Sequence, residues 1–202
     1  EEEKQEEEEV AKKFANAEIF MLLSYMSNFT SFGVTVCIAN QFIKQIVARD
    51  ISFPSIGGND PHGLFLGLFC CGTFLVQTGV LALGGVWTGW QYSRSFIYIT
   101  EAAGGMLMSA LMTFTENPYL LIVIGMFMGL HTGVAYISSL AYGFHTDVKK
   151  KGTLVGIHQS LISAAAIFMP PIAGAITTAT GQLWVPYLLC SGLVAVTIVL
   201  QE

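Results

Sequence analysis

Charged residues are scarce in this sequence, and those present gather at one end. Only 11% of the 202 residues are charged, and residues 1–13 hold seven Glu and three Lys. The other 189 residues carry 13 charges and a net charge of −1. This excludes a nucleic-acid binder, which needs a basic patch or stripe. With 53% hydrophobic residues and a mean hydropathy of +0.60, the chain is not a disordered one, and its natural solvent is lipid.

Patterns for metal binding, disulfides and catalysis are also lacking. The four cysteines stand in apolar runs without CxxC spacing, so we expect no metal, no cofactor and no disulfide framework. HExxH, GxSxG and carboxylate pairs on facing helices are absent, which argues against an enzyme. The start of the chain does not have the pattern of a signal peptide, and we expect the chain to be a piece of a longer protein. The cysteines are Cys37, Cys70, Cys71 and Cys190.

Long uncharged stretches predict helices that cross a membrane. A helix needs about 20 apolar residues to span the hydrocarbon core. Residues 152–201 carry no charge and are too long for one helix, so we divide them at the Thr/Gly-rich segment 177–182. The predicted fold is all-α, a polytopic membrane protein with a bundle of six transmembrane helices. The expected spans are about 18–43, 63–87, 95–114, 118–144, 152–177 and 183–200.

The basic residues predict the orientation of these spans. An even number of crossings puts both termini on one side, and the side richer in Lys and Arg is cytoplasmic. Seven basic residues fall on the terminal side, whereas Lys44 and Arg49 fall on the other. We therefore expect an integral protein of the cytoplasmic (inner) membrane with both ends of this segment in the cytoplasm. Residues 1–16 would be an acidic cytoplasmic linker and residues 17–202 the transmembrane domain.

Polar residues recur at helical spacing inside the first two spans. Residues spaced by three or four lie on one face of a helix, and a polar face avoids lipid. Such a stripe lines either a neighbouring helix or a water-filled cavity, and the sequence leaves both open. The stripe in the first span is Ser24, Asn28, Ser31 and Thr35, and the shorter one in the second span is Thr73 and Gln77.

The fourth span has two different faces. Gly125, Gly129 and Gly133 form a small-residue ridge suited to close helix packing. A second stripe holds His131, Ser138 and Tyr142. His131 lies near the middle of the span, where an ionisable residue usually faces the bundle interior or an aqueous path. It is either a neutral structural histidine or a group that titrates, since an unperturbed histidine has a pKa of about 6.5.

Glu101 is the one acidic residue within a span, and its cost in the membrane must be offset. It leans toward Arg94 at the cytoplasmic end of its helix. Glu18 and His158 begin at a similar depth in their own spans. We therefore expect a cytoplasmic-side ionic cluster of these four residues, which serves as a structural anchor or as a proton relay.

Two adjacent prolines interrupt the fifth span. Pro170 and Pro171 remove intrahelical hydrogen bonds and are expected to kink the helix. A kink there would either serve gating or shape static packing.

The segment AYISSLAYGFHTDVKKKGTLVGIHQSLISAAAIFMPPIAG at 135–174, together with the six spans, resembles the carboxy-terminal half of a major facilitator superfamily transporter. In that half, a short basic loop often joins the fourth and fifth helices and is followed by Gly, a His-containing helix start and a Gly/Pro-rich segment. The same order is found here in residues 149–156, His158 and residues 170–174. The loop GGVWTGWQYSR at 84–94 is similar to the family's loop between the second and third helices, but Gly89 stands at the usual acidic position and Ser93 at a usual basic one.

The resemblance implies that the first and fourth spans line a central cavity, with the second and fifth beside it and the third and sixth outside. It also implies that substrate binds near the midplane between two such halves. Together with the stripes it gives His131 as the candidate for proton coupling. The expected cavity residues are Asn28, Thr35, Gln77, His131, Ser138, Tyr142, Gln159 and Ser163.

We therefore expect a secondary active transporter that moves a small solute across the membrane by alternating access, with this chain as its carboxy-terminal half. Its partners would be the lipid bilayer, a small-molecule solute with a coupling proton or cation, and the amino-terminal six-helix half of the same protein. No nucleic acid is expected. The alternative is a non-transporting membrane scaffold or sensor with an acidic cytoplasmic tail.

Overall fold

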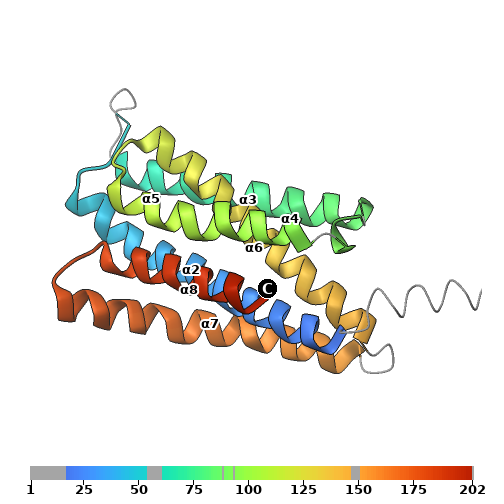
Figure 1. Ribbon diagram of the computed structural model, residues 1–202. Coiled ribbons are helices and arrows are strands. Elements are labelled where there is room, and N and C mark those ends of the chain that lie inside the picture. The colour runs from blue at the N-terminus through green and yellow to red at the C-terminus, as the bar shows by residue number, and fades with distance from the viewer. Residues whose placement is uncertain (1–16, 54–60, 88, 93, 147–150, 202) are drawn as a thin grey trace, which may run out of the picture.

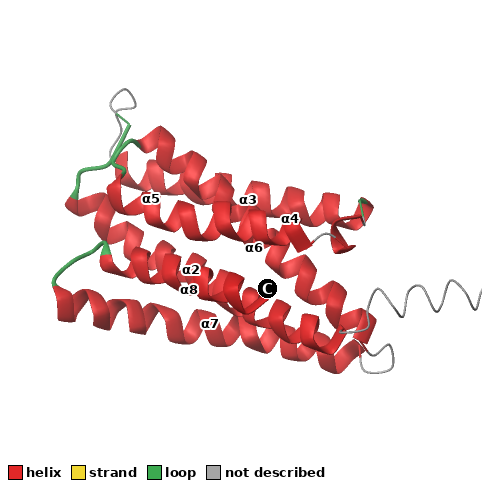
Figure 2. Ribbon diagram, viewed as in Figure 1, coloured by secondary structure: helices red, strands yellow, loops and turns green. Residues whose placement is uncertain are grey.

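Every regular element in the described part of the chain is helical (Figure 2). The computed structural model describes residues 17–53, 61–87, 89–92, 94–146 and 151–201. The predicted all-α class is confirmed for these residues. In chain order the elements are α2 (Ala17–Ala48), α3 (Pro61–Val86), η1 (Gly89–Tyr92), α4 (Arg94–Thr100), η2 (Glu101–Leu107), α5 (Met108–Phe114), α6 (Pro118–Thr146), α7 (Lys151–Thr180) and α8 (Val185–Gln201).

Five helical segments of the described chain are long and apolar enough to cross a membrane. The chain therefore has the architecture of a helical membrane protein. A sixth apolar helix is shorter, at Val185–Leu200. With 17 residues α8 extends about 26 Å, slightly less than the roughly 30 Å of the hydrocarbon core. Its crossing stays a prediction. The five segments are Met21–Ala48, His62–Val86, Ser95–Phe114, Pro118–Ala141 and Gly152–Thr180.

The helices end where local chemistry satisfies their terminal backbone groups. Asn117 Oδ1 accepts hydrogen bonds from the backbone N–H of Tyr119 and Leu120, at 3.0 and 3.2 Å, and so caps α6. Asp50, two residues after the end of α2, has φ +51°, and the Ile51 N–H donates to the Ile46 carbonyl at 3.0 Å. This left-handed arrangement closes a helix C-terminus.

We expected one regular helix over residues 95–114, but the third apolar segment is not a single regular α-helix. Between α4 and α5 the backbone forms the π-helical segment η2. Its two glycines, Gly104 and Gly105, face α6, and a β-carbon on Gly104 would lie 2.7 Å from His131 Cβ. Glycine is required there because the two backbones approach too closely for a side chain.

The bundle has α2 at its centre. In Figure 1, α2, α7 and α8 lie side by side, while α3 to α6 form the other side of the bundle. The apolar core fills the end near the α2 C-terminus, where Phe42 contacts Phe65 and Phe69 with ring centroids 5.9 and 4.6 Å apart. Four buried polar residues of α2, namely Ser24, Ser27, Asn28 and Ser31, lie toward its N-terminus, whereas Gln41 and Gln45 are buried near its C-terminus. The bundle interior is thus more polar toward the α2 N-terminus.

The predicted glycine ridge on α6 is confirmed as the contact with α3. A β-carbon on Gly133 would lie 3.0 Å from the Val80 side chain, and one on Gly125 would lie 2.8 Å from Thr73 Oγ1. In the fifth span, α7 continues as a helix through Pro170 and Pro171. The kink expected at these two residues stays a prediction.

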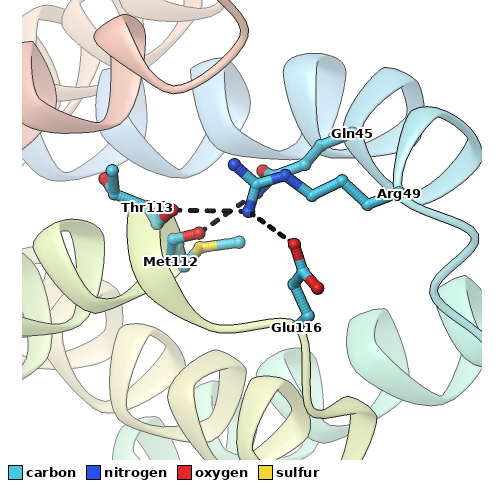
Figure 3. Close-up of polar contacts among 5 residues, drawn as sticks. All are labelled: Gln45, Arg49, Met112, Thr113 and Glu116. Carbon is cyan, nitrogen blue, oxygen red and sulfur yellow. Dashed lines mark hydrogen bonds and ion pairs between the residues drawn. The ribbon is translucent and has the colours of Figure 1, made fainter.

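The C-terminal end of α2 is fastened to the C-terminal end of α5 (Figure 3). Gln45 Nε2 donates to the Met112 carbonyl at 3.2 Å, and Arg49 Nη1 donates to the Thr113 carbonyl at 3.3 Å. Arg49 also lies 3.8 Å from Glu116. The last carbonyls of a helix have no intrahelical partner and attract a cation, so these two side chains stabilise the end of α5.

Removing these contacts is expected to destabilise the bundle unequally. Gln45→Leu leaves the buried Met112 carbonyl without this donor, and we expect a loss of about 1–3 kcal/mol. Glu116→Gln removes only an ion pair whose acid is 67% exposed, which we expect to matter by less than about 1 kcal/mol. Thermal unfolding in detergent measures both, and an equal loss in the two variants would contradict the assignment.

Candidate functional site

Buried and half-buried polar side chains on the inner faces of α2, η2, α6 and α7 form what we call the central polar cluster. Its residues come from segments far apart in the chain and lie toward the α2 N-terminal end of the bundle. Its members are Ser27, Asn28, Ser31, Thr35, Glu101, His131, Thr132, Ser139 and His158.

His158 of α7 is held by polar groups of α2 and α6. Its Nδ1 lies 3.3 Å from Asn28 Nδ2 and 2.7 Å from Ser139 Oγ. An amide nitrogen can only donate, so Nδ1 accepts and the neutral ring carries its proton on Nε2. The rings of Tyr25 and Tyr136 stand 6.4 and 4.7 Å from the imidazole. His158 therefore joins three helices at one point.

Glu101 begins η2 and is buried, with only 1% of its surface exposed. Ser27 Oγ donates a hydrogen bond to its carboxylate. The resemblance implied an outer position for this helix, whereas the carboxylate reaches the central helix α2. Within the predicted ionic cluster, Glu101 and His158 thus contact adjacent residues of α2. The side chains of Glu18 and Arg94 lie outside the described residues.

His131 lies near the middle of α6, with 2% of its surface exposed. Its ring faces the π-helical segment, and a β-carbon on Gly105 would lie 2.8 Å from His131 Nε2. Within the described part of the chain, neither ring nitrogen has a hydrogen-bond partner. The ring occupies the space that the missing side chain of Gly105 leaves.

Other members of the cluster also keep unused hydrogen-bonding capacity. Thr132 donates to the Met128 carbonyl, so its oxygen accepts from Thr35, 2.8 Å away. Ser31 lies one turn from Thr35 and is fully buried. Among the described residues, nothing bonds Ser31 Oγ, Asn28 Oδ1 or His158 Nε2. Together with the His131 nitrogens, these atoms can donate to and accept from a neutral polar molecule.

The structure brings some of the predicted cavity residues together and leaves others apart. Asn28, Thr35 and His131 belong to the cluster. Ser138 is buried, but its hydroxyl donates to the Ala135 carbonyl of its own helix at 3.1 Å. Gln77 is half-buried on α3.

The two predicted residues of α7 lie elsewhere. Gln159 and Ser163 are exposed on its outer face, where Gln159 Nε2 donates to the Tyr136 hydroxyl at 3.2 Å. The side chain of Tyr142 lies outside the described residues.

Sequence reasoning missed Thr132, Tyr136 and Ser139, which contact α2 and α7. Their spacing of i, i+4 and i+7 is a helical stripe, so the signal was present in the sequence. It lies one residue away from the stripe that starts at His131. The signal for Ser27 was weaker, because serine is common in helix packing within membranes.

The tight fit of His131 against η2 makes Gly105 a sensitive position. We expect Gly105→Ala to destabilise the fold by about 1–3 kcal/mol, because the new methyl group overpacks against the imidazole. In a His131→Ala background the same change should be tolerated. Gly67→Ala is the matched control, since nothing lies within 4 Å of a β-carbon there. Thermal unfolding of the four variants provides the test, and an undiminished loss in the His131→Ala background would refute the contact.

Comparison with known proteins assigns no family. No family model matches this chain, and no curated protein matches it. A functional interpretation therefore depends on the residues and their arrangement, chiefly the central polar cluster.

Proposed function

We propose that this chain is the carboxy-terminal half of a secondary active transporter of the major facilitator type, which moves a small solute across the membrane by alternating access. The observation that carries the proposal is the unused hydrogen-bonding capacity of the central polar cluster. A buried polar group without a partner is costly, and in a membrane-spanning helix it usually marks a functional site.

The chemistry of the cluster favours a neutral polar solute. Asn28, Ser31 and the two histidines offer uncharged donors and acceptors, and the cluster contains no Lys or Arg. Glu101 is its acidic member, and Ser27 already donates to that carboxylate. The placement of the cluster on α2, α6 and α7 agrees with the cavity-lining first and fourth spans, and the flanking fifth, that the resemblance implies.

The low burial of α3 and α7 supports the proposal that a second, amino-terminal half packs against this chain. Only 22% and 17% of their most apolar windows are buried, against 44–56% for the other three long segments. The exposed face of α7 carries Gln159, Ser160 and Ser163, and lipid is a poor solvent for such groups. An amino-terminal six-helix half packed against this face would cover them. The protein would lie in the cytoplasmic membrane with both ends of this segment in the cytoplasm.

His131 is the proposed proton-coupling residue. It lies near the middle of α6, faces η2 and has no partner for either nitrogen among the described residues. Taking up a proton there creates a charge that the surrounding glycines cannot satisfy. Protonation would therefore favour an arrangement in which α6 and η2 separate and the ring meets water or solute.

Transport by the full-length protein tests this role. In vesicles with an imposed pH gradient, a panel of small neutral polar solutes is screened with the wild-type protein. His131→Ala and His131→Gln should both remove the dependence of uptake on the pH gradient, because neither new side chain takes up a proton near neutral pH. Ser138→Ala is the control, because that hydroxyl bonds only its own helix. Unchanged uptake and unchanged pH dependence in both His131 variants would remove this residue from the mechanism.

The burial of the cluster also fits the second candidate, a membrane scaffold or sensor. Asn28, His131 and His158 are at most 2% exposed, as permanently structural groups would be. The same assay separates the two functions. A wild-type protein that is folded in vesicles and moves none of the solutes would favour the scaffold.

A further inference from the structure

An apolar groove lies between α7 and α8, away from the central polar cluster. Its volume is about 310 Å³, and its described lining residues are all apolar. The floor is made of small side chains, namely Cys37, Ala173 and Cys190, which are at most 3% exposed. The rim is made of larger ones, including Ile172, Leu189 and Leu193, which are 43–50% exposed. The groove exists because small residues on the floor lie between large residues on the rim.

The position of the groove along the helices sets its depth in a bilayer. It is lined by the second half of α7 and the first half of α8, so it begins beneath the loop that joins them. From Pro186 to Leu193 it extends about 10 Å along α8. In that loop Trp184 donates from Nε1 to Gln182 Oε1 at 3.0 Å. Tryptophan typically lies at the membrane–water interface, so the groove runs from that interface toward the midplane.

We infer that this groove binds one acyl chain of a bilayer phospholipid, with the headgroup at the level of Gln182 and Trp184. The inference rests on the membrane-helix architecture and does not depend on transport. The described lining residues are all apolar, so the groove matches a ligand that is apolar along its whole length. An acyl chain is narrow, wholly apolar and abundant at this depth.

Packing supplies the driving force for occupancy. Between apolar surfaces in lipid there is little hydrophobic effect, and close contact decides the association. A gap along the floor would forfeit dispersion contacts of the side chains that line it. A chain lying in the groove restores them and covers Cys37 of α2 and Cys190 of α8, which both line the floor.

Photo-crosslinking tests the inference in the full-length protein. The protein is placed in phosphatidylcholine nanodiscs in which a fraction of the lipid carries a diazirine on its acyl chain, and adducts are located by peptide mass spectrometry. We expect adducts to be several-fold enriched on residues 169–176 and 186–193. Ala173→Leu, which fills the floor, should remove the enrichment. Ala175→Leu is the matched control, because Ala175 is exposed on the same helix outside the groove.

A second pair of variants avoids changing the buried floor. Leu189→Trp places an indole at the exposed rim and should block the groove, while Leu188→Trp, one residue outside the lining, should not. Labelling no higher than on the exposed face of α3, or labelling unchanged in Ala173→Leu and Leu189→Trp, would overturn the inference. So would protection of the groove by a second copy of the chain, detected as a disulfide-linked dimer of Leu189→Cys.

Discussion

The interior of a membrane leaves a polar side chain few partners except those on neighbouring helices, and the position of α2 follows from this constraint. Every neighbour in the polar half of the bundle is tied to α2 by a polar contact: Asn28 to α7, Thr35 to α6 and Ser27 to η2. Thr30 adds α8, since its hydroxyl lies 3.1 Å from that of Thr197. Because each contact uses a different residue of one helix, α2 fixes the relative depth of the helices around it.

The same helix separates the bundle into two kinds of interior. From Val34 onward its inward residues are mainly apolar, and Val34, Ile38 and Phe42 belong to the main hydrophobic core. Atoms without partners among the described residues occur at both ends, and Gln45 Oε1 and Thr113 Oγ1 are examples at this one. The other end differs because polar side chains of α2, η2, α6 and α7 gather there in one cluster.

Much of this arrangement could be predicted from the sequence. Uncharged stretches marked the long helices, and the stripe of Asn28, Ser31 and Thr35 marked the face of α2 that turns inward. Charge was a poorer guide to helix ends, because α2 continues past Lys44 to Ala48. It does so since Gln45 and Ile46 are buried on its inner face, while Lys44 points outward. Arg49 served only to predict orientation, yet it binds the end of α5.

The rest depended on contacts that no local pattern encodes. Whether His131 or its neighbour Thr132 faces α2 is a matter of about 100° of rotation, and both stripes were visible in the sequence. The packing of Gly125, Gly129 and Gly133 against α3 is one of the tertiary contacts that fix that rotation. Gln159 was predicted as a cavity residue, and α7 places it on an exposed face outside the central polar cluster. The π-helical segment also has no sequence signature beyond its two glycines.

The π-helical segment η2 changes which residues of the third apolar stretch lie on the same face. In a π-helix each hydrogen bond spans five residues instead of four, so η2 contains more chain than an α-helix of equal length. The faces of α4 and α5 are consequently out of phase with a single 3.6-residue repeat. Residues seven or eleven apart across Glu101–Leu107 do not share a face, as they would in a continuous helix. Deletion of one residue inside η2 would restore the repeat and rotate one end of the stretch relative to the other.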